Sequence, residues 1–221
     1  MTGKSMEYFD IYDLNMRPIE PYKISKSEAH KKGYWHKTFH CWIVNKNNKV
    51  LLQLRPSKDG LKELFDISTA GHIMSGESPE DGVRELKEEL NLDVNFSDLT
   101  FAGIYKHTSI REEDNYFNNE FSYTYFYKSE KNLDEYVLQE EEVRGVFEID
   151  IDEGIKFFAK EIDTLKVSGL VLNSGSLVKK DMEIKLKQMC MYHERCVVTN
   201  YYLRALIMVK RFIQGKKHIA I

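Results

Sequence analysis

Short runs of apolar and aromatic residues recur along the first two thirds of the chain, and their lengths are typical of β-strands. The polar segment Asn45–Lys49 separates two of these runs and suits a hairpin turn, so we expect the runs on either side of it to pair. The runs cover Tyr8–Tyr12, Thr38–Ile43, Val50–Arg55, Phe65–Ala70, Phe101–Tyr105, Phe121–Tyr127 and Val143–Ile149.

Helical patterns are fewer in this part of the chain. The clearest predicted helix is Ser78–Leu90, because Ser78 can cap it, Pro79 suits its first turn and Asn91 can end it. A second helix is expected over residues 153–162, and a short one in the polar stretch that ends at His30. Strands therefore outnumber helices up to about residue 162.

The last third of the chain has a different pattern. Val178–Tyr192 and Val198–Ile213 both carry apolar residues at helical spacing, which predicts two helices. We therefore expect a mixed α/β (α+β) domain over residues 1–162, including an N-terminal strand region. Residues 163–221 are expected to form a C-terminal helical extension that packs on this domain or makes a dimer contact.

Composition narrows the classes of function. The chain has 221 residues, of which 42% are hydrophobic, so it can bury a full core. Its 32 basic and 35 acidic residues leave a net charge of −3, which disfavours a nucleic-acid polymer as partner. No window approaches the roughly 18 apolar residues of a membrane span, and the first residues show no apolar signal region. We expect no membrane partner and a cytoplasmic protein, in which the three cysteines, Cys41, Cys190 and Cys196, are reduced.

The predicted helix at Ser78–Leu90 carries the candidate chemistry. At about 100° per residue, Glu85, Glu88 and Glu89 fall within an arc of about 100°, so three carboxylates share one face. Like charges four residues apart destabilise an isolated helix by roughly 0.2–0.5 kcal/mol, and a divalent cation would compensate. The alternative is an ordinary solvated acidic face.

The segment before this helix makes the metal hypothesis more specific. Gly71, Glu77, Arg84-Glu85 and Glu88-Glu89 resemble the Nudix box, whose pattern is G-x5-E-x7-R-E-U-x-E-E-x-G-U with U aliphatic. Six residues rather than seven separate Glu77 from Arg84, and Asn91 stands where the pattern has glycine. Asparagine tolerates the left-handed conformation that glycine adopts, so the second departure is mild.

The resemblance implies a Nudix-type α/β/α sandwich that holds Mg²⁺ or Mn²⁺ against a small-molecule diphosphate. It implies that Glu85, Glu88 and Glu89 are both catalytic residues and metal ligands, with Glu85 and Glu89 foremost. Carboxylates agree with this, because Mg²⁺ prefers them together with substrate phosphates. The supporting residues would be Arg84, which orients the carboxylates, with Gly71, His72 and Glu77.

A second layer of resemblance covers Trp35–Val44 and Leu51–Arg55, which are similar to the Nudix branch that contains isopentenyl diphosphate isomerase and its hydrolase-like relatives. The isomerase has a catalytic cysteine where this chain has Ala70, so an acid/base group of the isomerase reaction is absent. Of the isomerase metal-site histidines, His36 and His72 match, and His30 is approximately placed for another.

Glu120 matches one metal-site glutamate of that branch, and Asn118 replaces the other. Glu120 is therefore a candidate metal ligand or general base, and ordinary surface charge is the alternative. His36 and His40 are candidates for a second metal site or for substrate contacts, and a purely structural pair of strand residues is the alternative.

The leading hypothesis is therefore a Nudix pyrophosphohydrolase that uses Mg²⁺ or Mn²⁺ to hydrolyse a nucleoside diphosphate-linked or other small diphosphate. Two alternatives remain: an isopentenyl diphosphate isomerase-like enzyme, which Ala70 disfavours, and a catalytically weak binding or regulatory module of the same fold. The family resemblance and the apolar tail make a homodimer an additional expectation.

Overall fold

A computed structural model describes residues 6–21, 23–57, 63–111, 115–192 and 200–221 of the chain. The described strands are β1 (Tyr8–Phe9), β2 (Ile24–Ser25), β3 (Trp35–Asn45), β4 (Val50–Arg55), β5 (Leu64–Asp66), β6 (Thr69–His72), β7 (Thr100–Arg111), β8 (Tyr116–Ser129), β9 (Gly145–Ile149), β10 (Leu165–Asn173) and β11 (Ser176–Ile184). The described α-helices are α1 (Lys26–Lys32), α2 (Arg84–Leu90), α3 (Ile151–Phe158) and α4 (Tyr201–Ile213).

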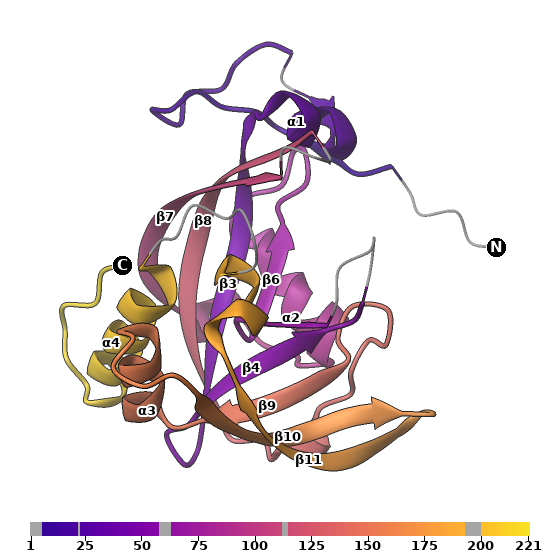
Figure 1. Cartoon of the computed structure of the whole chain (residues 1–221). Helices are drawn as coiled ribbons and strands as arrows, with labels where there is room; N and C mark the ends of the chain where they lie inside the picture. Colours follow the sequence, from indigo (N-terminus) through magenta and orange to yellow (C-terminus); the bar gives the residue numbers. More distant parts are fainter. Residues whose placement is uncertain (1–5, 22, 58–62, 112–114, 193–199) are drawn as a thin grey trace.

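Within the described residues, nine of the strands form one mixed sheet (Figure 1). Its order is β11-β10-β9-β4-β3-β8-β7, with β5 paired to β4 and β6 paired to β3. Strands β3 and β8 run parallel over eleven residue pairs, from Trp35↔Asn119 to Asn45↔Ser129, and the other neighbours are antiparallel. The predicted mixed α+β fold class is confirmed.

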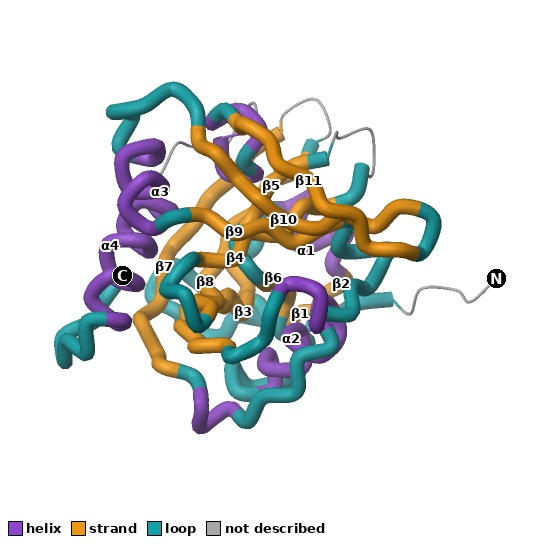
Figure 2. The backbone as a smooth tube through the Cα atoms, turned by 90° about the horizontal axis from the view of Figure 1, so that it is seen from below, coloured by secondary structure: helices purple, strands orange, loops and turns teal. Residues whose placement is uncertain are grey.

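Successive side chains of β3 point to opposite faces of the sheet, and each face packs into a different core. Trp42 and Val44 face the main core, which also contains the buried residues of α3 and α4, whereas Cys41 and Ile43 face a second core that contains Leu86 of α2. Helices α3 and α4 therefore cover one face of the sheet and α2 the other, as Figures 1 and 2 show. Helix α2 is thus anchored by its apolar side.

The predicted strand Phe65–Ala70 is divided into β5 and β6, because β3 and β4 separate at this point and each takes its own partner. Ser68, between the two short strands, joins the separating pair. Its hydroxyl oxygen accepts a hydrogen bond from the backbone N–H of Ile43 (2.8 Å) and donates one to the backbone oxygen of Leu51 (2.6 Å).

The helix predicted at Ser78–Leu90 is shorter in the structure. A 3₁₀ turn at Asp81–Val83 precedes α2, and Ser78 is not its cap. Instead the carboxylate of Asp81 accepts hydrogen bonds from the backbone N–H and the hydroxyl of Ser78, both at 2.8 Å, which closes a turn before the helix. The predicted C-terminal stop is confirmed, because Asn91 is left-handed with φ 48°.

The C-terminal extension is only partly helical, so the helix predicted at Val178–Tyr192 is wrong. Its first part is strand β11, which pairs with β10 through a turn whose central residues, Ser174 and Gly175, have φ of 50° and 80°. Val178, Met182 and Ile184 alternate in position and so fit one strand face as well as a helix. Cys196 and the start of the second predicted helix lie outside the described residues.

Helix α4 packs inside the fold rather than beside it. Tyr201, Tyr202, Ala205, Leu206 and Val209 are fully buried in the main core. The apolar stripe of α4 is therefore buried in the core of this same chain. No described helix combines the length and the apolar character that crossing a membrane requires.

Candidate functional site

The candidate site is a polar pocket of about 530 Å³ that lies against β3, β6, β8 and α2. Its walls bring together the acidic residues of α2, a row of histidines from the sheet and the arginine that ends β4. The lining residues used below are His30, His40, Arg55, Asp66, Gly71, His72, Arg84, Glu85, Glu88, Glu89, His107, Asn118 and Glu120.

Glu85 lies directly against Gly71 of β6. A Cβ atom at position 71 would stand 2.0 Å from the carboxyl carbon of Glu85, so only glycine leaves room for this side chain. Glu85 is buried, and this burial raises its pKa to about 7 despite the opposing charge of Arg84. The glycine of the box thus makes the space in which a buried carboxylate is held.

Arg84 holds the acidic group together. Its guanidinium contacts one oxygen of Glu85 at 2.7 Å, one of Glu88 at 2.9 Å and one of Glu77 at 3.3 Å. It also donates a hydrogen bond to the backbone oxygen of His72 at 2.8 Å. Despite the shorter spacing in the sequence, Glu77 therefore reaches Arg84, and its other oxygen accepts a hydrogen bond from the backbone N–H of Met74.

Glu89 is the most deeply buried acid of α2, and 4% of its surface is exposed. Its Oε2 atom has no hydrogen-bond partner among the described residues. Burial raises the pKa of Glu89 well above its usual value, and the positive charge of Arg55 acts against that shift. Arg55 is itself fixed by Asp66, whose carboxylate lies 3.2 Å from the guanidinium.

Glu88 differs from the other two acids of the helix. Its side chain is 54% exposed and contacts Arg84 at the rim of the pocket. The three carboxylates predicted to share one face are therefore brought together, but only Glu85 and Glu89 are buried.

Glu120 lies across the pocket on β8, and it is buried rather than a surface charge. One of its oxygens accepts a hydrogen bond from Asn118 at 2.7 Å, and the other lies 4.0 Å from Nε2 of His40. Burial opposes ionisation of Glu120, but the neighbouring histidines, with His107 the strongest, hold its pKa below the usual value. Glu120 is thus an ionised carboxylate with one oxygen less firmly held.

Three histidines form a cluster, and two of them, His30 and His72, line the pocket. One ring nitrogen each of His30, His36 and His72 lies within 4.8 Å of the others. Burial is the main cause that lowers the pKa of all three, to about 4 for His30, so they are neutral at pH 7. Phe9 stacks on His36 and His72 and excludes solvent from one side of the cluster.

His36 is prepared for ligation. Its Nδ1 atom lies 3.0 Å from the backbone oxygen of Tyr34, and a neutral ring with this hydrogen bond keeps its proton on Nδ1. The lone pair of Nε2 then faces the cluster, where this nitrogen has no partner among the described residues. His40, the other histidine singled out on β3, does not join this cluster and faces Glu120 instead.

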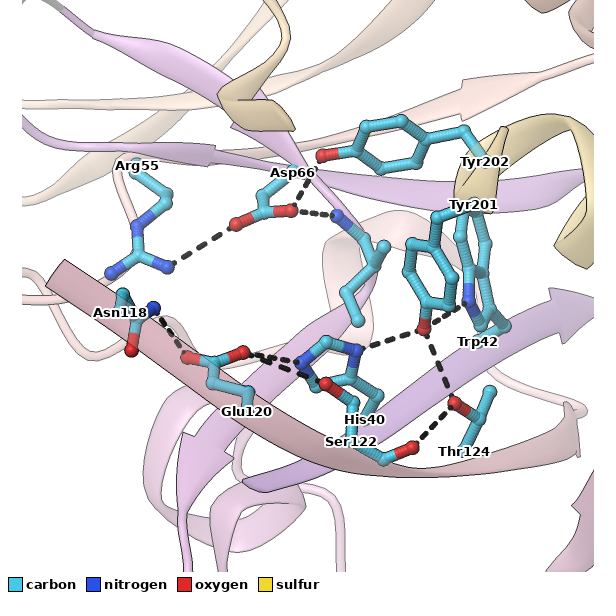
Figure 3. Close-up of polar contacts among 11 residues, drawn as sticks. His40, Trp42, Arg55, Asp66, Asn118, Glu120, Ser122, Thr124, Tyr201 and Tyr202 are labelled. Atoms are coloured by element: carbon cyan, nitrogen blue, oxygen red, sulfur yellow. Dashed lines mark hydrogen bonds and ion pairs between the residues drawn. The ribbon is translucent and has the colours of Figure 1, made fainter. Parts of the chain in front are cut away.

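Some lining residues could not be expected from the sequence. Arg55 stands within a segment that resembles the isomerase branch, but Asp66 gave no signal of its own. Tyr201 of α4 likewise gave no signal of its own, and its hydroxyl contacts His40 of the pocket wall (Figure 3).

The chain is similar in sequence to proteins of one known family. Residues 35–165 match the NUDIX domain family, a range that includes α2 and excludes α4. An uncharacterized Nudix hydrolase from Clostridium acetobutylicum is 43% identical over 174 residues, which cover 76% of this chain and 81% of that protein. Nudix hydrolase 3 from Arabidopsis thaliana is 32% identical over 157 residues, which cover 68% of this chain and 20% of the plant protein. Among solved structures, a Deinococcus radiodurans protein aligns with a TM-score of 0.49 and 18% identity, over 70% of this chain and 90% of that one.

Proposed function

The chain belongs to the Nudix family of pyrophosphohydrolases, and on that premise we propose that it hydrolyses a diphosphate bond in a nucleoside diphosphate-linked or other small diphosphate, with Mg²⁺ or Mn²⁺ as cofactor. The observation that supports this most is the pair of buried carboxylates, Glu85 and Glu89, in one pocket. Buried acids without full compensation are costly unless a cation joins them.

The residues present fit a divalent cation. Glu85, Glu89 and Glu88 offer carboxylate oxygens, which are the donors that Mg²⁺ and Mn²⁺ prefer. The unpartnered Oε2 of Glu89 is a donor atom already desolvated and aimed at the pocket. When bound, such a cation neutralises charge on the diphosphate and lowers the pKa of bound water.

Side chains of this protein would position the acids, bind the substrate phosphates and accept a proton. Arg84 keeps Glu85 and Glu88 in position through its contacts at 2.7 and 2.9 Å. Arg55 presents a fixed positive charge to the substrate phosphates, since Asp66 holds its guanidinium. Glu120 accepts the proton of the attacking water on the oxygen that Asn118 does not hold.

The histidine cluster is a candidate for a second cation. His30, His36 and His72 are neutral and buried, which are the properties that imidazole ligands need. Mn²⁺ is a hard cation like Mg²⁺, but as a transition-metal ion it accepts imidazole ligands more readily than Mg²⁺ does. Titrating metal-free protein with Mn²⁺ and observing relaxation of the histidine resonances would test this site separately from catalysis.

The experiment that tests the function is release of phosphate or nucleoside monophosphate from a panel of diphosphates with Mg²⁺, with Mn²⁺ and with EDTA. The panel spans nucleoside diphosphates, ADP-ribose, sugar nucleotides, dinucleotides and isopentenyl diphosphate. We expect turnover of one substrate class that EDTA abolishes and that Glu89→Gln reduces by about 10² or more. Turnover in EDTA, or near wild-type turnover by Glu89→Gln, would contradict the proposal.

A further inference from the structure

Helix α4 places two adjacent tyrosines against residues of the pocket wall, His40 and Asp66, although it lies outside the residues that match the NUDIX domain. We propose that Tyr201 and Tyr202 are positioning residues of the hydrolase: Tyr201 sets the proton position on His40, and Tyr202 sets the direction of Arg55. The effect on turnover rests on the proposed function, whereas the placement of His40 and Arg55 does not. Figure 3 shows the two hydroxyl groups and the side chains they reach.

The hydroxyl of Tyr201 has three polar neighbours. Nε1 of Trp42 donates a hydrogen bond to it at 3.2 Å, because an indole nitrogen can only donate. Nδ1 of His40 lies 2.8 Å away, and Oγ1 of Thr124 lies 3.4 Å away. Thr124 directs its own proton to the backbone oxygen of Ser122, so it can only accept from Tyr201.

This accounting leaves two arrangements for the single proton of Tyr201. If it goes to Nδ1 of His40, the neutral ring carries its proton on Nε2, and that N–H points toward Oε2 of Glu120 at 4.0 Å. If it goes to Thr124, the lone pair of Nε2 faces the carboxylate instead. The first arrangement uses the shorter contact and places a positive dipole end against a negative charge, so it is favoured.

Tyr202 acts on the opposite side of the pocket. Its hydroxyl donates to Oδ1 of Asp66 at 2.9 Å, and the backbone N–H of Ile67 donates to the same oxygen at 2.9 Å. Oδ2 of Asp66 therefore remains for Arg55, whose guanidinium lies 3.2 Å away. The chain of contacts Tyr202–Asp66–Arg55 ends at the pocket that Glu89 also lines.

A purely structural role is the alternative, since both tyrosine rings are fully buried in the main core. Phenylalanine would fill the same volume in that case, and the loss of the hydroxyl's hydrogen bonds would lower stability without changing kcat or KM. Tyr136 provides a matched control. It is also buried, and its hydroxyl donates to Ser129 at 2.8 Å in the second core, away from the pocket.

The first test measures the ring nitrogens of His40 by ¹⁵N NMR, assigned by comparison with His40→Asn. In wild-type protein we expect the proton on Nε2 and an unprotonated, hydrogen-bonded Nδ1. In Tyr201→Phe the Nδ1 resonance should move and the Nε2 proton occupancy should fall, whereas Tyr136→Phe should leave both unchanged. A proton on Nδ1 in wild type, or identical spectra in Tyr201→Phe, would overturn the role of Tyr201.

The second test is kinetic and uses the best substrate of the panel. We expect Tyr201→Phe to lower kcat by about tenfold with little change in KM, because it disturbs the group that faces the general base. We expect Tyr202→Phe to raise KM by about tenfold, because it loosens the arginine that faces the phosphates. Unchanged kcat and KM in both variants, with a loss of stability only, as expected for Tyr136→Phe, would leave the tyrosines as core residues only.

The two proposals can fail separately. If no diphosphate is hydrolysed, the proposed function fails, and the nitrogen resonances still decide whether Tyr201 positions His40. If hydrolysis is found and the spectra of Tyr201→Phe are unchanged, the inference about α4 fails and the hydrolase remains.

Discussion

Replacing Glu85 with glutamine removes a charge from the most crowded part of the site. In the folded protein burial raises the pKa of Glu85 from 4.5 to about 7, even though Arg84 opposes the shift. At 1.36 kcal/mol for each pKa unit, the ionised carboxylate costs the metal-free fold about 3 kcal/mol. The variant keeps the shape of the side chain and an oxygen that Arg84 can still contact.

The sign follows from proton linkage. Because the folded pKa is the higher one, native Glu85 keeps its proton where the unfolded chain has lost it, and stability falls as the pH rises from about 4.5 through about 7. Glu85→Gln does not titrate, so this loss is absent in the variant. We expect wild type and variant to be similar at pH 4.5, and the variant to be more stable by up to about 3 kcal/mol at pH 8.

The assay is denaturant unfolding in EDTA at pH 4.5, 6 and 8, combined with hydrolysis in Mg²⁺ at pH 8. We expect the variant to gain stability without metal and to lose at least about 10² in turnover, the combination typical of a residue kept for function. Glu88→Gln is the control for stability, since that side chain is 54% exposed. A variant that is less stable than wild type at pH 8 would refute the reasoning, because the contact with Arg84 would then outweigh the cost of burial.

Three further predictions concern the box and the tail. Gly71→Ala should lower turnover by about 10² with a smaller effect on stability, because the new Cβ displaces the Glu85 carboxylate; steady-state kinetics and thermal unfolding check this. Arg84→Lys should weaken metal binding by about tenfold in a Mn²⁺ titration, since an ammonium cannot reproduce the forked contacts of the guanidinium. Leu206→Ala should destabilise the chain by about 2–5 kcal/mol in denaturant unfolding, because this fully buried side chain of α4 packs against Gly154 of α3.

The sequence was sufficient for most of the elements because each strand carries its own apolar signal. The run at Val50–Arg55 matches β4 at both ends. It was not sufficient where strand pairing determines the structure. Nothing in residues 65–70 themselves indicates that they form two strands, one paired with β4 and the other with β3. Val178–Ile184 fitted a helix and a strand equally, and the turn at Ser174 and Gly175 resolved the choice.

The candidate site, too, could be predicted from the sequence only in part. The acids of α2 are adjacent in the sequence, so their convergence could be predicted from one helical turn. Their difference could not, since burial of Glu85 and Glu89 and exposure of Glu88 depend on the sheet they pack against. Contacts such as Arg55 with Asp66 depend on the pairing of β4 with β5, and those of the tyrosines on a helix far along the chain.

The contact between His40 and Tyr201 joins residues 161 positions apart. During synthesis the whole NUDIX range emerges from the ribosome before either tyrosine does, at about 5–20 residues per second. For those seconds His40 and Asp66 have no hydroxyl partner, and the main core lacks the side chains of α4. The nascent chain therefore passes through a stage in which the acids and histidines of the pocket are already made, while the hydroxyl groups that contact His40 and Asp66 arrive only when α4 docks.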